Sequence, residues 1–92
     1  MTAYYMICLD LRGKRCLVVG GGRVATEKAA GLVAAGASVT AVAPDVDDEL
    51  TALPVEVARR PFTASDVVGQ FLVIAATNDR LVNRRVSSAA RD

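Results

Sequence analysis

Three consecutive glycines, Gly20, Gly21 and Gly22, are the residues of this 92-residue sequence whose spacing most clearly suits a ligand. With the residues after them they match the dinucleotide-binding pattern G-x-G-x-x-G/A, as Gly20-Gly21-Gly22-Arg23-Val24-Ala25. In that pattern Gly20 permits a tight turn, Gly22 lets the backbone approach a pyrophosphate, and Ala25 keeps the helix close to the sheet. The free amides at the helix start then bind the phosphates, helped by the helix dipole. The alternative is a glycine-rich turn that binds nothing.

Two further pairs of residues could contact the same dinucleotide. Pro44 and Asp45 follow an apolar run, and an acid in that place hydrogen-bonds the adenosine ribose and disfavours the 2′-phosphate of NADP. We therefore expect NAD as the cofactor, although Pro44 can shape the loop so that backbone meets the ribose, and Asp45 can also serve as a turn residue or cap. Thr77 and Asn78 follow another apolar run, where they can face the cofactor or cap the last helix.

These residues are positioned by alternating strands and helices. Apolar runs at 15–19 and 38–43 flank a helical pattern from Arg23 to Ala35, which Gly36 ends. Strand, glycine turn, helix and strand form a βαβ unit with parallel strands. A short strand at 55–59 and a strongly apolar one at 71–75, expected to be central, complete the sheet in the order 3-2-1-4. The prediction is an α/β, Rossmann-like three-layer fold with a small, mostly parallel sheet.

The connecting segments are expected to be short and mostly exposed. A short helix lies within 45–53 and carries a solvated acidic cluster, and residues 63–66 can cap one helical turn. The final helix, capped by Thr77 or Asn78, turns Val82, Val86 and Ala89 to the core. Its four arginines are read as solvated surface, or one of them meets a phosphate or an anionic substrate: Arg80, Arg84, Arg85 and Arg91. The pattern looks truncated after this helix, so a partner or a continuation would complete the sheet.

Composition excludes several functions. With 52% hydrophobic and 23% charged residues, the chain is expected to fold as a single domain over residues 1–92. A net charge of +1 favours neither nucleic acid nor an anionic membrane, and the absence of histidine argues against metal sites and Ser-His-Asp catalysis. Cys8 and Cys16 are interpreted as core residues. Neither a signal peptide nor a membrane-spanning run is evident, so a cytoplasmic location is expected.

Three blocks in this order carry a family resemblance: residues 9–25, residues 39–44, and residues 74–79 with Val82, Asn83 and Val86. Together they resemble the N-terminal NAD-binding domain of the siroheme synthase family. These are the precorrin-2 dehydrogenases, which are free-standing or fused to a methyltransferase. The resemblance implies NAD-dependent oxidation of precorrin-2 to sirohydrochlorin, in the family often coupled to ferrous iron insertion.

The resemblance also assigns residues. It places cofactor contacts on Gly22, Arg23, Val24, Pro44, Asp45, Thr77 and Asn78. The family's catalytic aspartate belongs to an Asn-Val-x-Asp type segment after the last helix, which no residue of this chain matches. The dimerisation and tetrapyrrole-binding regions are likewise not among these residues. We therefore predict no catalytic residue here, negligible activity for the 92 residues alone, and a homodimer for the complete protein.

One departure and one alternative function accompany this interpretation. Glu27 stands where many family members have arginine, which puts any surface contact of that arginine in doubt. The alternative is a non-enzymatic, NAD-sensing regulatory module, because such modules share the glycine pattern. They usually lack both the Ala-Pro step before the acid and the block Ala75-Ala76-Thr77-Asn78-Asp79, and both are present here.

Overall fold

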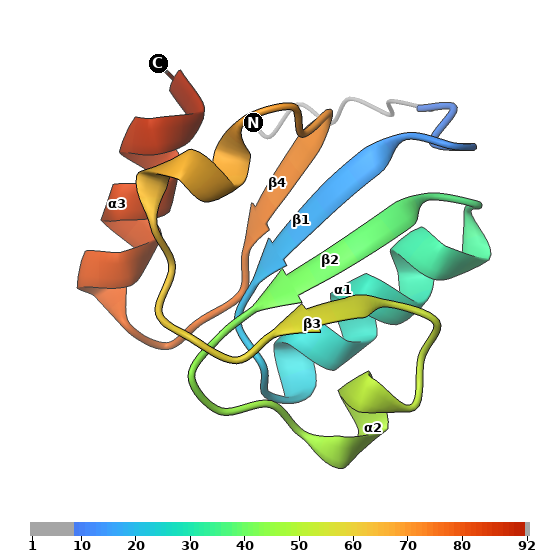
Figure 1. Cartoon of the computed structure of the whole chain (residues 1–92), viewed down its shortest axis with the longest axis horizontal. Coiled ribbons are helices and arrows are strands. Elements are labelled where there is room, and N and C mark those ends of the chain that lie inside the picture. The colour runs from blue at the N-terminus through green and yellow to red at the C-terminus, as the bar shows by residue number, and fades with distance from the viewer. Residues whose placement is uncertain (1–8, 92) are drawn as a thin grey trace, which may run out of the picture.

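The computed structural model describes residues 9–91 and contains one parallel sheet (Figure 1). Its four strands stand in the order β3-β2-β1-β4. They are β1 (Arg15–Val19), β2 (Ser38–Val42), β3 (Glu56–Ala58) and β4 (Leu72–Ala75). The helices are α1 (Arg23–Ala34), α2 (Asp48–Thr51) and α3 (Arg80–Arg91), with a short 3₁₀ turn, η1 (Ala64–Val67). All three strand pairings are parallel, so the predicted α/β class and strand order are confirmed.

β1 lies inside the sheet because it is apolar on both of its faces. Side chains alternate across a strand, so Cys16 and Val18 face one layer while Leu17 and Val19 face the other. All four are buried. This two-sided burial is typical of a parallel strand covered by helices on both faces.

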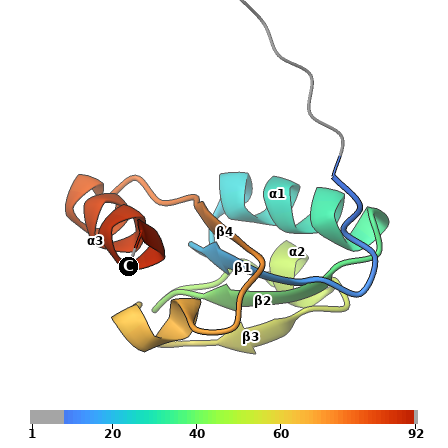
Figure 2. The same cartoon turned by 90° about the horizontal axis from the view of Figure 1, so that it is seen from above.

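Two helical layers cover the sheet, as the turned view in Figure 2 shows. On the Val18 face, α1 contributes Ala25, Ala29 and Leu32, and α2 contributes Leu50. On the Leu17 face, α3 contributes Val86, joined by Phe62 from the loop after β3. Val82 and Ala89 of α3 pack against the same cluster, as expected for its core-facing stripe. The predicted three-layer arrangement is therefore confirmed.

Gly36 ends α1 in the predicted way. Its φ is +85°, a left-handed conformation that glycine adopts without steric cost. The amide of Gly36 donates to the carbonyl of Val33 at 3.0 Å, and the amide of Ala37 donates to that of Leu32 at 3.1 Å. These two bonds form a Schellman motif, which turns the chain directly into β2.

The expectation of a central strand at 71–75 is wrong for the described chain. β4 pairs with β1 alone, at one edge of the sheet, and Leu72, Val73 and Ile74 are only half-buried. Its apolar residues pack into both layers, which accounts for the sequence signal. Apolar character reports contact with layers above and below a strand, whereas edge or interior position depends on pairing within the sheet.

Other elements are shorter than expected. β3 has three residues rather than the five predicted, and α2 has four within the predicted 45–53. The acidic residues around α2 are exposed, as expected: Asp47, Asp48 and Glu49. Cys16 is buried, as expected, and Cys8 lies outside the described residues. Among residues 9–91, no helix has the length and apolar character needed to cross a bilayer.

Candidate functional site

A cleft of about 570 Å³ lies at the carboxyl ends of the strands. This is the edge at which open parallel sheets bind ligands, and the volume suits a small organic molecule. The cleft is lined by all eight residues predicted to contact a cofactor: Gly20, Gly22, Arg23, Val24, Pro44, Asp45, Thr77 and Asn78. The structure thus brings together residues from three separate loops, and their contact with a cofactor stays a prediction.

The three glycines of the turn have different surroundings. Gly20 has φ +140°, and a Cβ there would collide with the carbonyl oxygen of Ala76. A Cβ on Gly21 would collide with the carbonyl of Asp45. A Cβ on Gly22 would meet no atom within 4 Å. Packing therefore requires glycine at Gly20 and Gly21, while Gly22 leaves open space at the cleft where a ligand could approach the backbone.

Gly21 also connects two loops of the site, a role that the sequence analysis did not assign. Its carbonyl accepts a 2.7 Å hydrogen bond from the amide of Asp47, and the amide of Gly20 donates to the carbonyl of Val42 at 2.9 Å. The loop after β2 is thereby held against the glycine turn. Asp45 is carried to the cleft by this fixed loop and not by a contact of its own side chain.

The first turn of α1 presents free backbone donors to the cleft. Gly22 is the N-cap residue and has no side chain to satisfy the first amides of the helix, among them those of Arg23 and Val24. The first helical bond runs from the amide of Thr26 to the carbonyl of Gly22, at 2.9 Å. The guanidinium Nε of Arg23 lies 3.4 Å from Glu27, and both side chains are exposed. Such a helix start suits an anion such as a pyrophosphate.

The loop between β4 and α3 is ordered by its own side chains. The Thr77 hydroxyl donates to the side-chain oxygen of Asn83 at 2.9 Å, and the Asn83 amide nitrogen donates back to the Thr77 carbonyl at 3.0 Å. The Asp79 carboxylate accepts bonds from the amides of Leu81, at 2.9 Å, and Val82, at 3.3 Å. Asp79 is therefore the cap of α3, and the prediction that Thr77 or Asn78 caps it is wrong. Asn78 is left exposed at the cleft.

Several lining residues were missed by sequence reasoning. Pro61 and Phe62 reach the cleft from the loop after β3, and Val82 and Arg85 reach it from α3. The loop after β3 could have been suspected, because the carboxyl ends of all parallel strands meet at one edge. Among the four arginines of α3, Arg85 alone lines the cleft; Arg80, Arg84 and Arg91 are exposed elsewhere, as expected.

The described residues offer little chemistry besides binding. Burial raises the pKa of the Cys16 thiol, which disfavours the reactive thiolate. Within residues 9–91, no three side chains of His, Cys, Asp or Glu type gather where they could hold a metal ion. The charged groups of the cleft are Asp45 and Asp79 with Arg23 and Arg85. The arrangement is that of a binding cleft.

A parallel sheet with a glycine turn, a free helix start and a cleft at its carboxyl edge defines a Rossmann-like dinucleotide-binding protein. Residues 7–92 match the family model described as "Putative NAD(P)-binding". The chain belongs to this NAD(P)-binding family.

Individual relatives refine this assignment. The chain is 49% identical over 92 residues to the siroheme synthase of Pseudomonas putida strain W619, matching 96% of this chain and 20% of that protein. It is 38% identical over 86 residues to the precorrin-2 dehydrogenase of Priestia megaterium, matching 89% of this chain and 43% of that protein. The solved structure of SirC, a precorrin-2 dehydrogenase, superposes with a TM-score of 0.85 at 38% identity, over 91% of this chain and 44% of SirC. The chain thus spans a fifth to less than half of these relatives, and it shares the Rossmann-like fold of SirC.

Proposed function

We propose that this chain is the NAD-binding part of a precorrin-2 dehydrogenase, the enzyme that oxidises precorrin-2 to sirohydrochlorin. The observation that carries the proposal is the cleft, in which all eight residues expected to contact the cofactor come together. The relatives named siroheme synthase and precorrin-2 dehydrogenase support the same reaction. They do not favour the regulatory NAD-sensing module considered from the sequence.

The residues present fit a dinucleotide. The open space at Gly22 and the amides of Arg23 and Val24 suit the pyrophosphate. Pro44 and Asp45, held by the loop that contacts Gly21, suit the adenosine ribose. Thr77 and Asn78 lie across the cleft on the β4 side, where the nicotinamide half would extend. When bound, NAD supplies the hydride acceptor of the reaction.

The reaction itself is proposed for the whole protein. We place residues 1–92 in a single cofactor-binding domain and assign no catalytic residue to them. The tetrapyrrole, any coupled iron insertion, a homodimer and a cytoplasmic location belong to the same proposal, and we assign no iron-binding residue to residues 9–91. The activity is tested by following NADH formation from precorrin-2 and NAD with the full-length protein. A protein that binds NAD but does not oxidise precorrin-2 would contradict the proposed substrate.

Cofactor binding is tested by calorimetric titration of the 92-residue chain with NAD. We expect saturable binding by the native chain and none by Gly22→Asp, because an aspartate there puts a negative charge and a side chain where the pyrophosphate would lie. Circular dichroism spectra of both proteins check that the variant is folded. A folded native chain that does not bind NAD would contradict the site assignment.

The cofactor preference depends on Asp45. We expect the native chain to bind NAD more tightly than NADP, because the carboxylate repels the 2′-phosphate. Asp45→Ser removes the charge and should narrow the difference between the two affinities. Asp48→Ser, an acid-to-serine change outside the lining of the cleft, is the matched control. An unchanged NAD-to-NADP ratio in Asp45→Ser would mean that backbone, and not this carboxylate, meets the ribose.

A further inference from the structure

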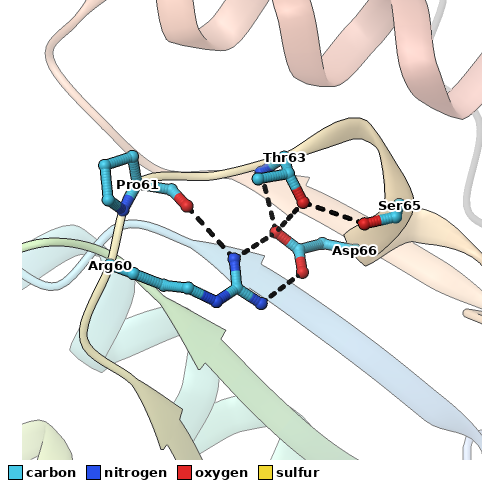
Figure 3. A network of polar contacts seen from close by, with 5 residues as sticks. All are labelled: Arg60, Pro61, Thr63, Ser65 and Asp66. Carbon is cyan, nitrogen blue, oxygen red and sulfur yellow. Dashed lines mark hydrogen bonds and ion pairs between the residues drawn. The ribbon is translucent and has the colours of Figure 1, made fainter.

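An ion pair closes the loop between β3 and η1, as Figure 3 shows. The two terminal nitrogens of the Arg60 guanidinium donate to the two carboxylate oxygens of Asp66, at 2.9 and 2.6 Å. The Asp66 side chain is only 9% exposed. A two-point contact between guanidinium and carboxylate fixes the relative orientation of both groups more strictly than a single contact between mobile side chains.

The same two side chains hold the backbone on both sides of Phe62. Arg60 also donates to the carbonyl oxygen of Pro61 at 3.1 Å, and Asp66 also accepts a 2.8 Å bond from the amide of Thr63. Phe62 stands between these two anchored residues. The residue is 6% exposed, and its side chain packs in the cluster with Val42 and Val86. The position of Phe62 is therefore fixed in two ways: its side chain packs in the core, and the ion pair anchors the backbone on either side of it.

Pro61 and Phe62 line the cleft, whereas Arg60 and Asp66 do not. β3 pairs with β2, so this loop leaves the sheet beside the strand that leads to Asp45. Pro61 and Phe62 consequently form a wall on the side of the cleft assigned above to the adenosine ribose. An apolar wall in that place suits the flat face of an adenine ring.

We propose that Arg60 and Asp66 are positioning residues for the adenosine half of the dinucleotide, acting through the wall of Pro61 and Phe62. The inference rests on the proposed function, because it takes NAD as the occupant of the cleft. Loss of the ion pair frees the backbone at Pro61 and Thr63 and lets the wall move. Ligand affinity should then fall although neither charged side chain touches the ligand.

The test compares the NAD affinity of three variants with that of the native chain. Asp66→Asn removes the negative charge and one of the two acceptor oxygens, and we expect NAD to bind about tenfold more weakly because the wall is no longer held in place. Arg60→Lys keeps the charge but not the two-point contact, so a smaller loss is expected. Asp10→Asn is the matched control, because it removes the two-point pair of Asp10 with Arg12, at 3.0 and 2.9 Å, outside the lining of the cleft. It should bind NAD as the native chain does.

Cofactor fragments separate positioning from general stability. All titrations are made at a temperature where circular dichroism shows each protein folded. ADP-ribose should lose as much affinity as NAD in Asp66→Asn, and nicotinamide mononucleotide should lose none. A purely structural role would lower the melting temperature and leave the affinity of the folded protein unchanged. The Arg60→Lys variant keeps the test decisive if Asp66→Asn does not fold.

The outcomes are distinguishable. A native chain that does not bind NAD contradicts the proposed function and this inference with it. A native chain that binds NAD, with folded Asp66→Asn binding equally well, contradicts this inference alone. Equal losses for both fragments would show that the wall does not act on the adenosine half.

Discussion

Gly21 and Gly22 are neighbours in the chain but meet opposite surroundings. Gly21 is packed against the carbonyl of Asp45, whereas Gly22 opens onto the cleft. The glycine pattern alone treats the middle position as free, although the loop after β2 lies directly on it. The two residues therefore have different roles: Gly21 maintains the shape of the site, and Gly22 leaves room for its ligand.

Replacing Gly21 or Gly22 by alanine should distinguish these two roles. Gly21→Ala should lower the free energy of unfolding by about 1–3 kcal/mol, the usual cost of overpacking, because its Cβ displaces the Asp45 loop. Gly22→Ala should change stability by no more than about 1 kcal/mol, because its φ of −92° is accessible to alanine and its Cβ meets open space. Urea unfolding of both variants measures the difference. If Gly21→Ala destabilised the chain no more than Gly22→Ala, the Asp45 loop would be able to move aside for the Cβ without an energetic penalty.

The ion pair of Arg60 and Asp66 should make stability depend on acid. The guanidinium of Arg60 holds the pKa of Asp66 below its usual value. A carboxyl whose pKa is lowered by folding stabilises the folded chain above the unfolded pKa, about 3.9, and this contribution is lost as the pH falls through the lower folded value. The range from roughly pH 6 to pH 3 brackets the unfolded pKa. As the pH is lowered over that range, the melting temperature should therefore fall less steeply in Asp66→Asn than in the native chain. Parallel slopes would show that another acid dominates.

At the scale of elements, α3 depends on a cap that lies one residue beyond those expected. Thr77 and Asn78 both have suitable side chains, but the Thr77 hydroxyl is hydrogen-bonded to Asn83. In the loop held in this way, Asp79 occupies the N-cap position of the helix. A cap is chosen by where the backbone enters the helix, and the bond between Thr77 and Asn83 spans residues that a local pattern does not compare. The sequence therefore indicated the helix but not its first residue.

Removing the cap of α3 should lower the stability of the folded chain. Asp79→Ala should cost about 1 kcal/mol in the free energy of unfolding, because two helix amides lose their acceptor. Asp79→Asn can still cap and should cost less. Urea unfolding followed by circular dichroism compares the variants. A loss of the same size in Asp79→Asn would point to charge rather than capping.

The features that could be predicted from the sequence are those determined by residues close together in the chain. The strand at 15–19, the glycine turn and the helix ended by Gly36 are adjacent in the chain, and each was confirmed. Phe62 was missed as a cleft residue because its position depends on β3 pairing with β2 and on packing beneath α3. The predicted strand order placed β4 last, but its apolar composition wrongly suggested a central strand, because position in the sheet depends on pairing and not on composition. Contacts between segments distant in the sequence determine both the position of Phe62 and the place of β4 in the sheet.

For the whole molecule, the cleft joins the two helical layers. Its lining includes the start of α1 from one layer and Phe62 and Val82 from the other. A ligand that occupies it contacts both layers only when they are assembled on the sheet. Binding should therefore be confined to the folded chain and should stabilise it as a unit.

This stabilisation is measurable. At a free NAD concentration of about 100 times Kd, the free energy of unfolding should rise by about 2.7 kcal/mol. The melting temperature should rise with NAD concentration in the native chain and stay constant in Gly22→Asp. A rise of the same size in the variant would mean that NAD binds elsewhere on the chain.

The order of the strands also has a consequence for how fast the chain folds. β1 pairs with β2 and with β4, and the second pairing joins Cys16 to Leu72, which lies 56 positions further along the chain. Loop closure of that length precedes any gain from the contact, so folding rates of parallel sheets are low for their size. During synthesis β1 can pair with β2 long before β4 leaves the ribosome, which leaves one edge of an apolar strand uncovered. The strand that supports the glycine turn is thus the one whose completion limits folding and whose exposure favours aggregation.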